Sequence, residues 1–385
     1  KFIDTEYDVL LIEQDSFLGG IIKNSNKIES IEQKNKIKWL EDTEKLIKNS
    51  KNIKILKNTL VTSYNFSNSL IALEDKFIGE SPKNHRPELT LHKIRTTHTI
   101  LANGHIERFI SFRNNDLPGI MLAESFEKYI HRYGVVPNMN PVIFTNNSSA
   151  LSLIKSLINL NCLPLAYIDS REEKSIEDET LKILSEKNIP TYYNSEIEGC
   201  EGNKIVEKIF IRNSNDKITK IRASMICVSG GVNPDVNLFT QSKGLIKWDN
   251  KHLTFKPHVP FQNTITLGSA SGNFNFNKIE EEINDKLTFL NVKDSKIKLK
   301  TSCCDELQIK ELWATKNIKE SLWSKSFIDL QNDVTIKDLK QAVTEGFDRI
   351  EHLKRFTTNS MGTDQGKISS INSLGVISKI LKKNI

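Results

Sequence analysis

The feature that most constrains the fold is a strand-helix-strand pattern in the middle of the sequence. An apolar run at residues 142–145 is followed by apolar side chains at helical spacing over residues 150–158. A second apolar run at residues 165–168 then ends at Asp169. A crossover of this length between two strands is typical of a βαβ unit with parallel strands. The pattern therefore predicts an α/β fold.

The elements that follow extend this unit. We expect a helix around residues 176–184, a strand at Tyr192 and a hairpin over residues 205–221. The sequence ASMICVSGGVNPD predicts an apolar strand that runs into a Gly-Gly turn. Further along, a strand at residues 264–267 precedes a turn of small residues at 268–272 and another helix.

The N-terminal part has strands of its own. The sequence DVLLIEQ predicts a short buried strand at residues 9–12 that ends at Glu13, and a turn at Gly19 and Gly20 follows. Thinly spaced apolar residues among lysines and glutamates indicate a solvent-facing amphipathic helix over residues 31–47. Strand-like pieces then occupy residues 53–56, 60–64, 69–73, 89–95 and 99–102. Their short length and the Asn, Ser and Pro between them predict a small antiparallel layer attached to a larger sheet.

Composition limits the classes of partner. The 385 residues suffice for two or three domains of a soluble, well-charged globular protein. No apolar run approaches the roughly 18 to 20 residues of a membrane-spanning helix. The net charge of +6 comes from lysines spread along the whole chain, which gives little support to nucleic-acid binding. We therefore expect neither a membrane nor a nucleic acid as a partner.

The cysteines and the first residue bear on context. Five cysteines, of which only Cys303 and Cys304 are close together, do not form a secreted disulfide framework. This favours a reducing, cytoplasmic environment. The chain begins with Lys1 rather than Met, and no signal peptide precedes the apolar run at residues 9–12. We therefore expect a fragment of a longer protein.

The same residue types give little evidence for metal binding or catalysis. Cys162 and Cys227 lie in apolar stretches and are expected in the core, whereas Cys200 is expected in a loop. A metal or redox role for Cys303 and Cys304 is the less favoured alternative, because no second Cys or His cluster lies nearby. None of the eight histidines is paired at a metal-ligand spacing. We expect no metal site, and we predict no catalytic acid or base.

Glu13 is the first candidate for cofactor binding. An acid at the end of the second strand of a dinucleotide-binding fold accepts hydrogen bonds from a ribose hydroxyl. The phosphate-binding glycines of that fold lie about 20 residues upstream of the acid, and here they would precede Lys1. Gly19 and Gly20 are then the remaining cofactor-side turn of this region. An ordinary solvated glutamate at a strand end is the alternative, and it is favoured when Glu13 is taken alone.

Two further turns have a similar character. In ILANGH a strand ends in Ala102, Asn103 and Gly104, and the glycine lets the backbone approach a bound dinucleotide closely. In ITLGSASG, Gly268 and Ser269 open a helical segment whose N-terminus would face a phosphate. Each turn alone is common, and the three turns together are more informative.

The middle unit lacks such a turn. Between its first strand and helix it reads TNNSSA, residues 145–150, without glycine. A backbone without glycine does not approach a pyrophosphate in the usual way, so we expect no dinucleotide there despite Asp169. We interpret this unit as scaffold.

The C-terminal part is predicted to be mainly helical. Residues 293–327 are expected to form a charged helical region. Thr335 and Asp338 then make a variant capping box, and the helix that they begin is expected to end at Gly346. A second short helix through Ile350 follows.

Three cations bracket the loop TTNSMGTDQGK in this part. Lys354 and Arg355 precede the loop, and Lys367 closes it. Backbone N–H groups and cations in such a loop can hold a phosphate. A solvated basic helix end explains the composition about equally well.

Four segments carry a resemblance to a known family. They are LIEQDSFLGG, ILANGHIERFISFRNNDLPGIM, FTNNSSA and, most specifically, FIDLQNDVTIKDLKQAVTEGFDRIEHLKRFTTNSMGTDQGK. Together they closely resemble the alpha subunits of heterotetrameric sarcosine oxidases, and the resemblance runs from end to end of the chain. It implies a nested pair of dinucleotide-binding domains, as in glutathione reductase, followed by a small helical domain. The implied domains are an N-terminally truncated NAD domain at 1–117 and 237–292, a degenerate Rossmann-like domain at 118–236, and a helical interface domain at 293–385.

The resemblance also implies a function. In that family, a complex of alpha, beta, gamma and delta subunits oxidatively demethylates sarcosine to glycine. It yields hydrogen peroxide and formaldehyde or methylenetetrahydrofolate. The beta subunit is expected to hold FAD and the chemistry, with FMN at the alpha–beta interface. A C-terminal folate-binding aminomethyltransferase domain is expected to be missing from this chain.

Residue roles follow from the same resemblance. Glu13 would hold the adenosine ribose of NAD, and Gly19 and Gly20 would lie on its phosphate side. The far turns would be Ala102, Asn103, Gly104, Gly268 and Ser269. The FMN phosphate would contact Lys354, Arg355 and Lys367. The last dinucleotide turn reads Gly-Ser where flavoproteins usually have Gly-Asp, which argues against FAD in this chain.

The small helical domain resembles bacterioferritin-associated ferredoxin modules, which bind a [2Fe-2S] cluster through four cysteines. At the matching positions this chain has Asp329, Gln331, Asp364 and Ser369. Because such a cluster needs thiolates, we expect none here and an interface role instead. A subunit of a related FAD/NAD-dependent amine or opine dehydrogenase, which would be expected to keep the cysteines, is one alternative. A non-catalytic fragment is the other.

Overall fold

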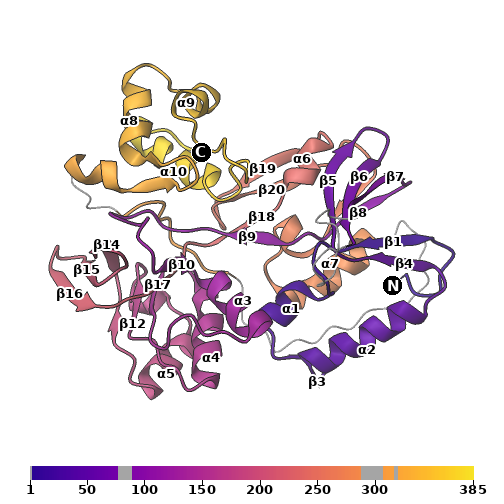
Figure 1. Ribbon diagram of the computed structural model, residues 1–385, viewed down its shortest axis with the longest axis horizontal. Helices are drawn as coiled ribbons and strands as arrows, with labels where there is room; N and C mark the ends of the chain where they lie inside the picture. The colour runs from indigo at the N-terminus through magenta and orange to yellow at the C-terminus, as the bar shows by residue number, and fades with distance from the viewer. Residues whose placement is uncertain (1, 77–88, 288–306, 316–319) are drawn as a thin grey trace, which may run out of the picture.

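The computed structural model describes residues 2–76, 89–287, 307–315 and 320–385. Its ribbon shows three regions: the N-terminal strands, a unit built around residues 118–236, and a group of C-terminal helices (Figure 1). We call residues 118–236 the inserted unit. The antiparallel pair of β9 (His105–Glu107) and β18 (Val232–Pro234) lies between the three regions.

A five-stranded parallel sheet forms the centre of the inserted unit. Its order is β10 (Ile120–Leu122), β17 (Ile226–Ser229), β11 (Val142–Thr145), β12 (Ala166–Asp169) and β13 (Thr191–Tyr192). β11 runs parallel to β12, from the Val142–Ala166 pair to the Thr145–Asp169 pair, so the predicted βαβ unit is confirmed. Every residue of β11, β12 and β17 is buried, which explains why these runs are continuously apolar.

The two faces of this sheet are covered differently. On one face, Ile143, Tyr167 and Cys227 pack against helices. These are α3 (Ala123–Tyr133), α4 (Leu151–Asn159) and α5 (Asp178–Glu186). On the other face, Phe144 and Ile168 pack against an antiparallel sheet. It consists of β14 (Ser195–Glu201), β15 (Lys208–Asn213) and β16 (Ile218–Arg222).

Cys200, which we expected in a loop, lies in β14 and is fully buried. It pairs with Ile209 of β15. β14 alternates acidic residues with buried ones, and only its inner face reaches the core. The prediction was wrong because glutamates alternate with the buried residues, so the segment has no continuous apolar run to indicate a strand. Cys162 and Cys227 are buried as predicted.

The N-terminal strands begin with a parallel pair, β1 (Val9–Ile12) and β4 (Ile53–Leu56). We expected β1 to be buried, but Leu10 is 37% exposed, and among the described residues β1 pairs only with β4. The chain between them forms α1 (Gly20–Asn24), β2 (Ser30–Ile31), β3 (Lys34–Asn35) and α2 (Lys36–Asn49).

The amphipathic helix was predicted to begin at residue 31, but α2 begins at Lys36. Residues before it form the β2–β3 hairpin, in which Ser30 pairs with Asn35. The Asn35 side chain then accepts the N–H of Ile37 at 2.9 Å. This N-cap fixes the start of the helix.

The predicted antiparallel layer is confirmed for three of its five strands. They are β5 (Thr59–Asn65), β6 (Ser69–Asp75) and β7 (Leu89–Arg95). The other two expected members lie elsewhere, because each pairs in parallel with a strand outside the layer. β4 pairs with β1, and β8 (Thr99–Leu101) pairs with β21 (Thr264–Thr266).

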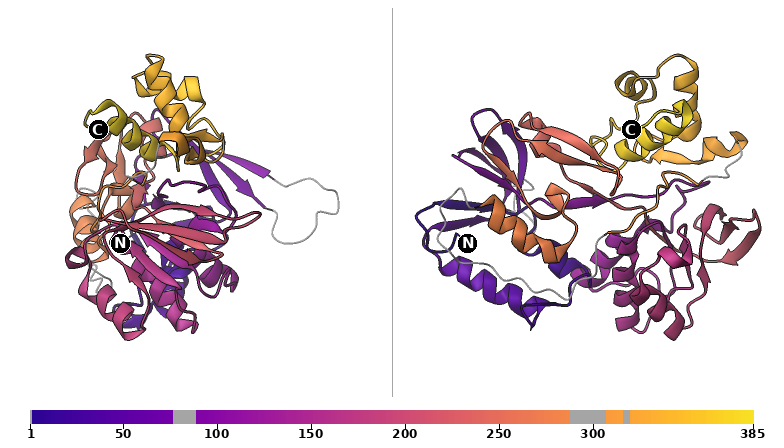
Figure 2. Two further views of the ribbon diagram at one scale, coloured as in Figure 1. Left: turned by 90° about the vertical axis from the view of Figure 1, so that its left-hand side faces the viewer. Right: turned by 180° about the vertical axis from the view of Figure 1, so that it is seen from behind.

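The β8–β21 pair returns the chain to the N-terminal strands after the inserted unit. The returning segment contains α6 (Asn237–Gln241), β19 (Leu245–Asp249), β20 (Thr254–Val259) and α7 (Ile279–Lys286). Ile283 of α7 belongs to one apolar cluster with Phe2, Tyr7 and Ile100. From behind, α7 is accordingly seen beside the N-terminal strands (Figure 2, right).

The C-terminal region has its own apolar core, which includes Ile328, Leu339 and Leu353. Its elements are η6 (Glu320–Lys325), β22 (Phe327–Asp329), β23 (Val334–Thr335), α8 (Ile336–Thr344), α9 (Ile350–Thr357) and α10 (Ser370–Leu381). The capping box of Thr335 and Asp338 is confirmed. α8 ends as predicted near Gly346, whose φ is +93° and whose N–H donates to the Val343 carbonyl.

The expected helical region 293–327 is confirmed only in part within the described residues: residues 320–325 form the 3-10 helix η6, whereas residues 307–315 do not form a helix. The N–H of Lys310 donates to the carbonyl of Asn146 at 2.9 Å, and Ala314 forms an isolated bridge with Ser111. Backbone pairing with Asn146 of the inserted unit and with Ser111, which precedes that unit, therefore overrides the local helical pattern. No helix within the described ranges is long and apolar enough to cross a membrane.

Candidate cofactor-binding site

Glu13 follows β1 directly and continues its pairing with β4. Its N–H donates to the Leu56 carbonyl at 2.8 Å, and its carbonyl accepts the N–H of Thr59 at 2.9 Å. Its carboxylate Oε1 accepts the N–H of Asp15 at 3.0 Å. Within the described residues, Oε2 of Glu13 has no hydrogen-bond partner. An acceptor at the carboxyl end of a parallel strand is the position from which an acid binds a ribose hydroxyl.

Gly19 and Gly20 lead into α1, and each has a positive φ, +115° and +41°. A Cβ at Gly19 would clash with the side chain of Leu40 in α2, whereas a Cβ at Gly20 would meet nothing within 4 Å. Gly19 is therefore required for packing against α2. Gly20 presents open backbone that a ligand can approach closely.

The turn of Ala102, Asn103 and Gly104 follows β8, and its first two residues are exposed. The side-chain amide of Asn103 donates to the Asp235 carbonyl at 2.8 Å. The N–H of Asp235 donates to the Gly104 carbonyl at 3.1 Å. Asp235, which follows β18, therefore holds this turn in place through two backbone contacts.

The third predicted turn lies beside the second. β21 ends at Thr266, the N–H of Leu267 donates to the Leu101 carbonyl at 3.0 Å, and the 3-10 turn η3 (Gly268–Ser271) follows. Both turns thus stand at the carboxyl ends of the parallel strands β8 and β21. Open α/β sheets bind their ligands at this edge.

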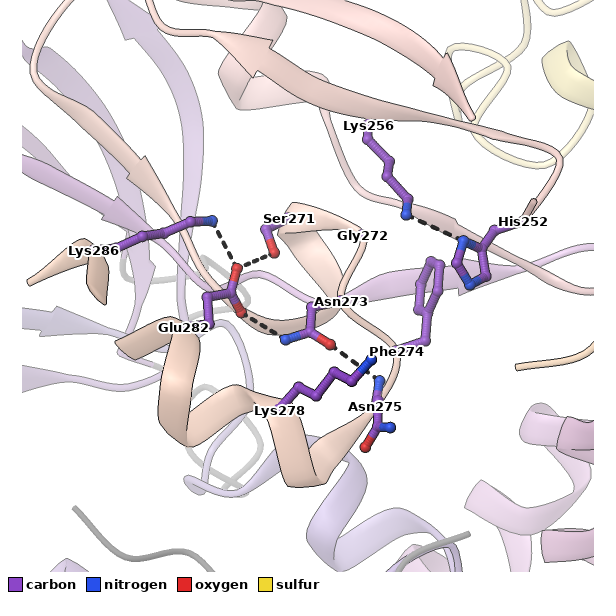
Figure 3. A pocket seen from close by; sticks show the side chains of 10 residues that line it. All are labelled: His252, Lys256, Ser271, Gly272, Asn273, Phe274, Asn275, Lys278, Glu282 and Lys286. Atoms are coloured by element: carbon purple, nitrogen blue, oxygen red, sulfur yellow. Dashed lines mark hydrogen bonds and ion pairs between the residues drawn. The ribbon is translucent and has the colours of Figure 1, made fainter. Parts of the chain in front are cut away.

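Glu282 of α7 reaches this third turn, as Figure 3 shows. Its Oε2 accepts the N–H of Gly268 at 2.9 Å and the side-chain amide of Asn273 at 3.2 Å. Its Oε1 accepts the ammonium group of Lys286 at 2.7 Å and the hydroxyl of Ser271. Burial alone would raise the pKa of Glu282, but hydrogen bonds from Lys286, Ser271 and Gly268 lower it below its ordinary value. The carboxylate is therefore ionised and surrounded by donors.

A pocket of about 300 Å³ opens beside this turn. Its lining residues are His252, Lys256, Ser271, Gly272, Asn273, Phe274, Asn275, Lys278, Glu282 and Lys286 (Figure 3). Lys256 lies 3.1 Å from Nδ1 of His252, and both contact Oδ2 of Asp249. Lys278 has no ion-pair partner in the part of the chain that the structure describes. The pocket is polar and carries more cationic than anionic side chains.

The three predicted phosphate-binding cations are placed differently. Lys354 and Arg355 lie in the last turn of α9, where the described residues offer them no ion pair. The ammonium group of Lys367 lies 3.1 Å from Oδ2 of Asp235. The structure therefore brings Lys367 to the turn that contains Gly104. It shows no such contact for Lys354 or Arg355.

In the inserted unit, the turn after β11 is filled by its own side chains. The side chain of Asn147 caps η1 (Ser148–Ala150) by accepting the N–H of Ser149 at 2.9 Å, and it donates to the Ser229 carbonyl. Asp169 is fully buried and pairs with Arg171 at 2.9 Å. These contacts fill the turn with the chain's own side chains, and they keep Asp169 away from solvent. The interpretation of this unit as scaffold stays a prediction.

The structure bears on only some of the predictions about cysteines and metal sites. Cys303 and Cys304 lie outside the described residues. Within the described ranges, no group of three or more His, Cys, Asp or Glu side chains is arranged to hold a metal ion. Burial raises the pKa of the Cys200 thiol to about 12 and also raises that of Cys227. Neither thiol therefore has the thiolate character of a reactive cysteine.

Comparison with known proteins shows which proteins this chain resembles. The chain is 27% identical over 380 residues to the sarcosine oxidase subunit alpha of Rhizobium meliloti (strain 1021), with 96% of this chain covered. It is 26% identical over 387 residues to the subunit alpha of Corynebacterium sp. (strain P-1). Residues 323–385 match the family model described as the sarcosine oxidase A3 domain. The chain is similar to sarcosine oxidase alpha subunits along nearly its whole length.

The sarcosine oxidase subunits are much longer than this chain. The matches span 37% and 40% of the two relatives. Among solved structures, L-proline dehydrogenase from P. horikoshii has the same fold, with a TM-score of 0.63 and 19% identity. That match covers 97% of this chain and 69% of the other. The overall architecture is therefore a Rossmann-like α/β fold that carries a sarcosine oxidase A3 domain.

The A3 domain brings together the four residues that stand at the expected cluster positions. The buried Asp329 accepts the N–H groups of Gln331 and Ser360 at 2.9 and 2.6 Å, and the Ser369 hydroxyl at 3.3 Å. Gln331 Oε1 accepts the N–H of Asp364 at 3.3 Å. These side chains satisfy backbone amides and one another, and none is a thiolate. They do not fit a [2Fe-2S] cluster.

Two site residues were missed by sequence reasoning. Asp235 joins the second turn to Lys367, and Glu282 holds the third turn. For Glu282 there was a partial signal, since Lys286 four residues later indicates a helical ion pair. For Asp235 the Gly-Gly-Val-Asn-Pro-Asp sequence indicated a turn but no contact.

Proposed function

We propose that this chain is the NAD-binding part of the alpha subunit of a sarcosine oxidase. The complex would oxidatively demethylate sarcosine to glycine, forming hydrogen peroxide and formaldehyde or methylenetetrahydrofolate. The similarity to sarcosine oxidase alpha subunits over 96% of the chain carries this proposal. We further propose beta, gamma and delta partner subunits, with the chemistry in the beta subunit.

The proposed domains follow the β8–β21 return of the chain. Residues 1–117 and 237–292 would form the NAD domain, residues 118–236 the degenerate Rossmann-like domain, and residues 293–385 the interface domain. The parallel pairing of Thr99 with Thr264 supports this nesting. We also propose that the last domain is related to ferredoxin modules that bind a [2Fe-2S] cluster. Asp329 and its hydrogen-bond partners would stand at the positions of the cluster's cysteines.

The proposed contacts to NAD start from Glu13, whose Oε2 would accept a hydroxyl of the adenosine ribose. Gly20 offers open backbone on the phosphate side, and Gly104 lies at the far turn. NAD, when bound, would supply a nicotinamide group, and these residues would only bind and orient it. The Gly-Ser sequence at residues 268 and 269 favours NAD over FAD.

The A3 domain is proposed to face the partner that shares FMN. Lys354 and Arg355 form no ion pair with the residues that the structure describes, so their ammonium and guanidinium groups would be available to the FMN phosphate. Lys367 would have to leave Asp235 to join them. We therefore rank Lys354 and Arg355 ahead of Lys367 for this role.

The central experiment is co-expression of the complete gene with its neighbours, followed by measurement of sarcosine-dependent peroxide formation and of bound NAD. Sarcosine turnover with one bound NAD per alpha chain is expected. A complex with intact flavin that leaves sarcosine untouched would overturn the sarcosine oxidase assignment. Turnover of another secondary amine, such as L-proline, would instead support the amine dehydrogenase alternative.

A paired substitution tests the ribose contact. Glu13→Ala is expected to lower NAD occupancy about tenfold or more, because a buried ribose hydroxyl loses a charged acceptor. Glu6→Ala removes an exposed carboxylate nearby in the sequence and serves as the matched control. Equal NAD occupancy in the two variants would remove Glu13 from the site.

A further inference from the structure

The carboxylate of Glu282 accepts the hydrogen bonds that the third turn, at Gly268, could otherwise donate to a bound anion. Four donors converge on the Glu282 carboxylate: the Gly268 amide, the Ser271 hydroxyl, the Asn273 side chain and the Lys286 ammonium group. Only 10% of the Glu282 side chain is exposed. Three of these donors lie in the turn at residues 268–273, and the fourth, Lys286, lies on α7. Together they form a complete anion-binding site, which the carboxylate of Glu282 occupies.

The same donors suit a phosphate group. A phosphate offers more acceptor oxygens than a carboxylate, and its preferred partners are backbone amides, hydroxyls and ammonium groups. This anion site is also continuous with the pocket in Figure 3, which Lys278 lines as well. Lys278 is exposed and has no ion-pair partner among the described residues. An entering phosphate would thus find an additional cation that Glu282 does not use.

We propose that this pocket is a phosphate-binding subsite for a phosphorylated ligand, and that Glu282 is an internal competitor that occupies its donors when the ligand is absent. The ligand's phosphate would displace the Glu282 side chain and take over the contacts to Gly268, Ser271 and Lys286. Lys278 would then approach the phosphate. The displaced carboxylate would move toward solvent, since α7 is only partly buried.

Competition has a direct consequence for affinity. Any phosphate that binds must first break the ion pair between Glu282 and Lys286, whose atoms are 2.7 Å apart. The protein therefore binds phosphate compounds more weakly than its donors alone would allow. Removing the negative charge at residue 282 frees the donors and leaves a net positive pocket.

The identity of the ligand as a dinucleotide rests on the proposed function, whereas the preference for phosphate does not. Two probes separate these points. Pyrophosphate tests the subsite itself, and NAD tests the dinucleotide. Both are titrated calorimetrically into the intact chain and its variants at fixed low salt.

The decisive variant is Glu282→Gln, which keeps the size and one acceptor oxygen. Its affinity for pyrophosphate is expected to exceed that of the wild type by about tenfold or more, because a like charge is removed from the anion site. Glu281→Gln changes the charge of the same helix equally at an exposed position, and it should leave the affinity nearly unchanged. Equal pyrophosphate affinity in Glu282→Gln and Glu281→Gln would overturn the proposal.

A second variant keeps the test independent of the turn's integrity. Lys278→Met removes an exposed ammonium group that forms no ion pair or hydrogen bond with any residue that the structure describes, so folding should be unaffected. It is expected to weaken pyrophosphate binding about threefold or more, whereas Lys54→Met, an exposed lysine outside the pocket, should not. No difference between these two variants would also count against the subsite.

The NAD arm distinguishes the two proposals. If Glu282→Gln binds pyrophosphate more tightly than the wild type but neither of the two binds NAD, the subsite stands and the NAD-binding function fails. If NAD binds equally to the wild type and Glu282→Gln while pyrophosphate affinity is also unchanged, the function stands and the competitor role fails.

Discussion

The ammonium group of Lys367 lies 3.1 Å from Oδ2 of Asp235, and this ion pair links the A3 domain to a predicted cofactor turn. The main chain of Asp235 holds the turn on its other side, through Asn103 and Gly104. One residue of the nested fold therefore contacts both the C-terminal domain and the edge of the parallel strands.

The first prediction concerns the strength of this link. Lys367→Met is expected to lower the free energy of unfolding by about 0.2–1 kcal/mol, because the lysine is 40% exposed and solvent screens the pair. A double-mutant cycle with Asp235→Asn, followed by urea denaturation, measures the coupling. Lys354→Met is the control, since Lys354 has no ion-pair partner within the described ranges. Zero coupling would mean that the ion pair does not form in solution.

The second prediction concerns Glu127, a buried carboxylate on α3. It accepts the hydroxyls of Ser152 and Ser156 at 2.7 and 2.6 Å, and the N–H of Asn26 at 3.2 Å. Burial raises its pKa from 4.5 to about 7, although these hydrogen bonds act in the opposite direction. Glu127 thus joins the inserted unit to the N-terminal segment through a group that titrates near neutral pH.

The sign of the effect follows from the raised pKa. The folded state holds the proton more tightly than the unfolded state, so the contribution of Glu127 is fully favourable below pH 4.5. It is lost as pH rises toward 7, by up to about 3 kcal/mol. Glu127→Gln should remove this slope between pH 4.5 and 7 in urea denaturation curves. Glu124→Gln is a poor control because Glu124 contacts His105, so the exposed Glu186→Gln is used. An unchanged slope in Glu127→Gln would contradict the assignment.

The third prediction concerns the capping box of α8. Thr335→Ala removes the hydroxyl that accepts the N–H of Asp338 and donates to its carboxylate. A loss of about 1 kcal/mol in the free energy of unfolding is expected. Thr335→Ser keeps the hydroxyl and should cost much less. Equal losses for both variants would show that the methyl group, and not the cap, is responsible.

The fourth prediction compares two glycines with positive φ. Gly231 has φ +102°, and a Cβ there would clash with the Arg108 guanidinium and with Ile309. Gly134 has φ +64°, and a Cβ there would meet nothing within 4 Å. Gly134→Ala is expected to cost about 1–2 kcal/mol from backbone strain alone. Gly231→Ala should cost about 3 kcal/mol or more, because overpacking adds to the strain. Similar melting temperatures for the two variants would argue against the clash.

The sequence predicted those parts of the fold whose signals are local. β11 and β12 were found because both faces of the parallel sheet are buried and the runs are continuously apolar. The capping box of Thr335 and Asp338 was found because its partners are three residues apart. By contrast, the helix expected at residues 307–315 is absent. The conformation of this segment depends on hydrogen bonds with Asn146 and Ser111, which are far away in the sequence and leave no local pattern.

In the candidate site, too, the features with a local sequence signal were predicted and those that depend on distant contacts were not. Sequence patterns located the turns at Gly20, Gly104 and Gly268, because glycine after a strand has a local meaning. They did not predict that Glu282 bonds to the Gly268 amide, since that contact depends on the path of the chain between η3 and α7. Nor did they indicate that Asp235 separates Lys367 from the other cations. Such contacts arise only when distant segments meet.

The pairing of β8 with β21 has a consequence for synthesis. Thr99 leaves the ribosome long before its partner Thr264, with the entire inserted unit between them. At about 5 to 20 residues per second, the wait is on the order of 10 to 30 s. The inserted unit has its own sheet and cores and can form during that interval, whereas β8 has no parallel partner until translation delivers β21. The parallel edge that carries the turns at Gly104 and Gly268 is therefore completed only after the inserted unit has been synthesised.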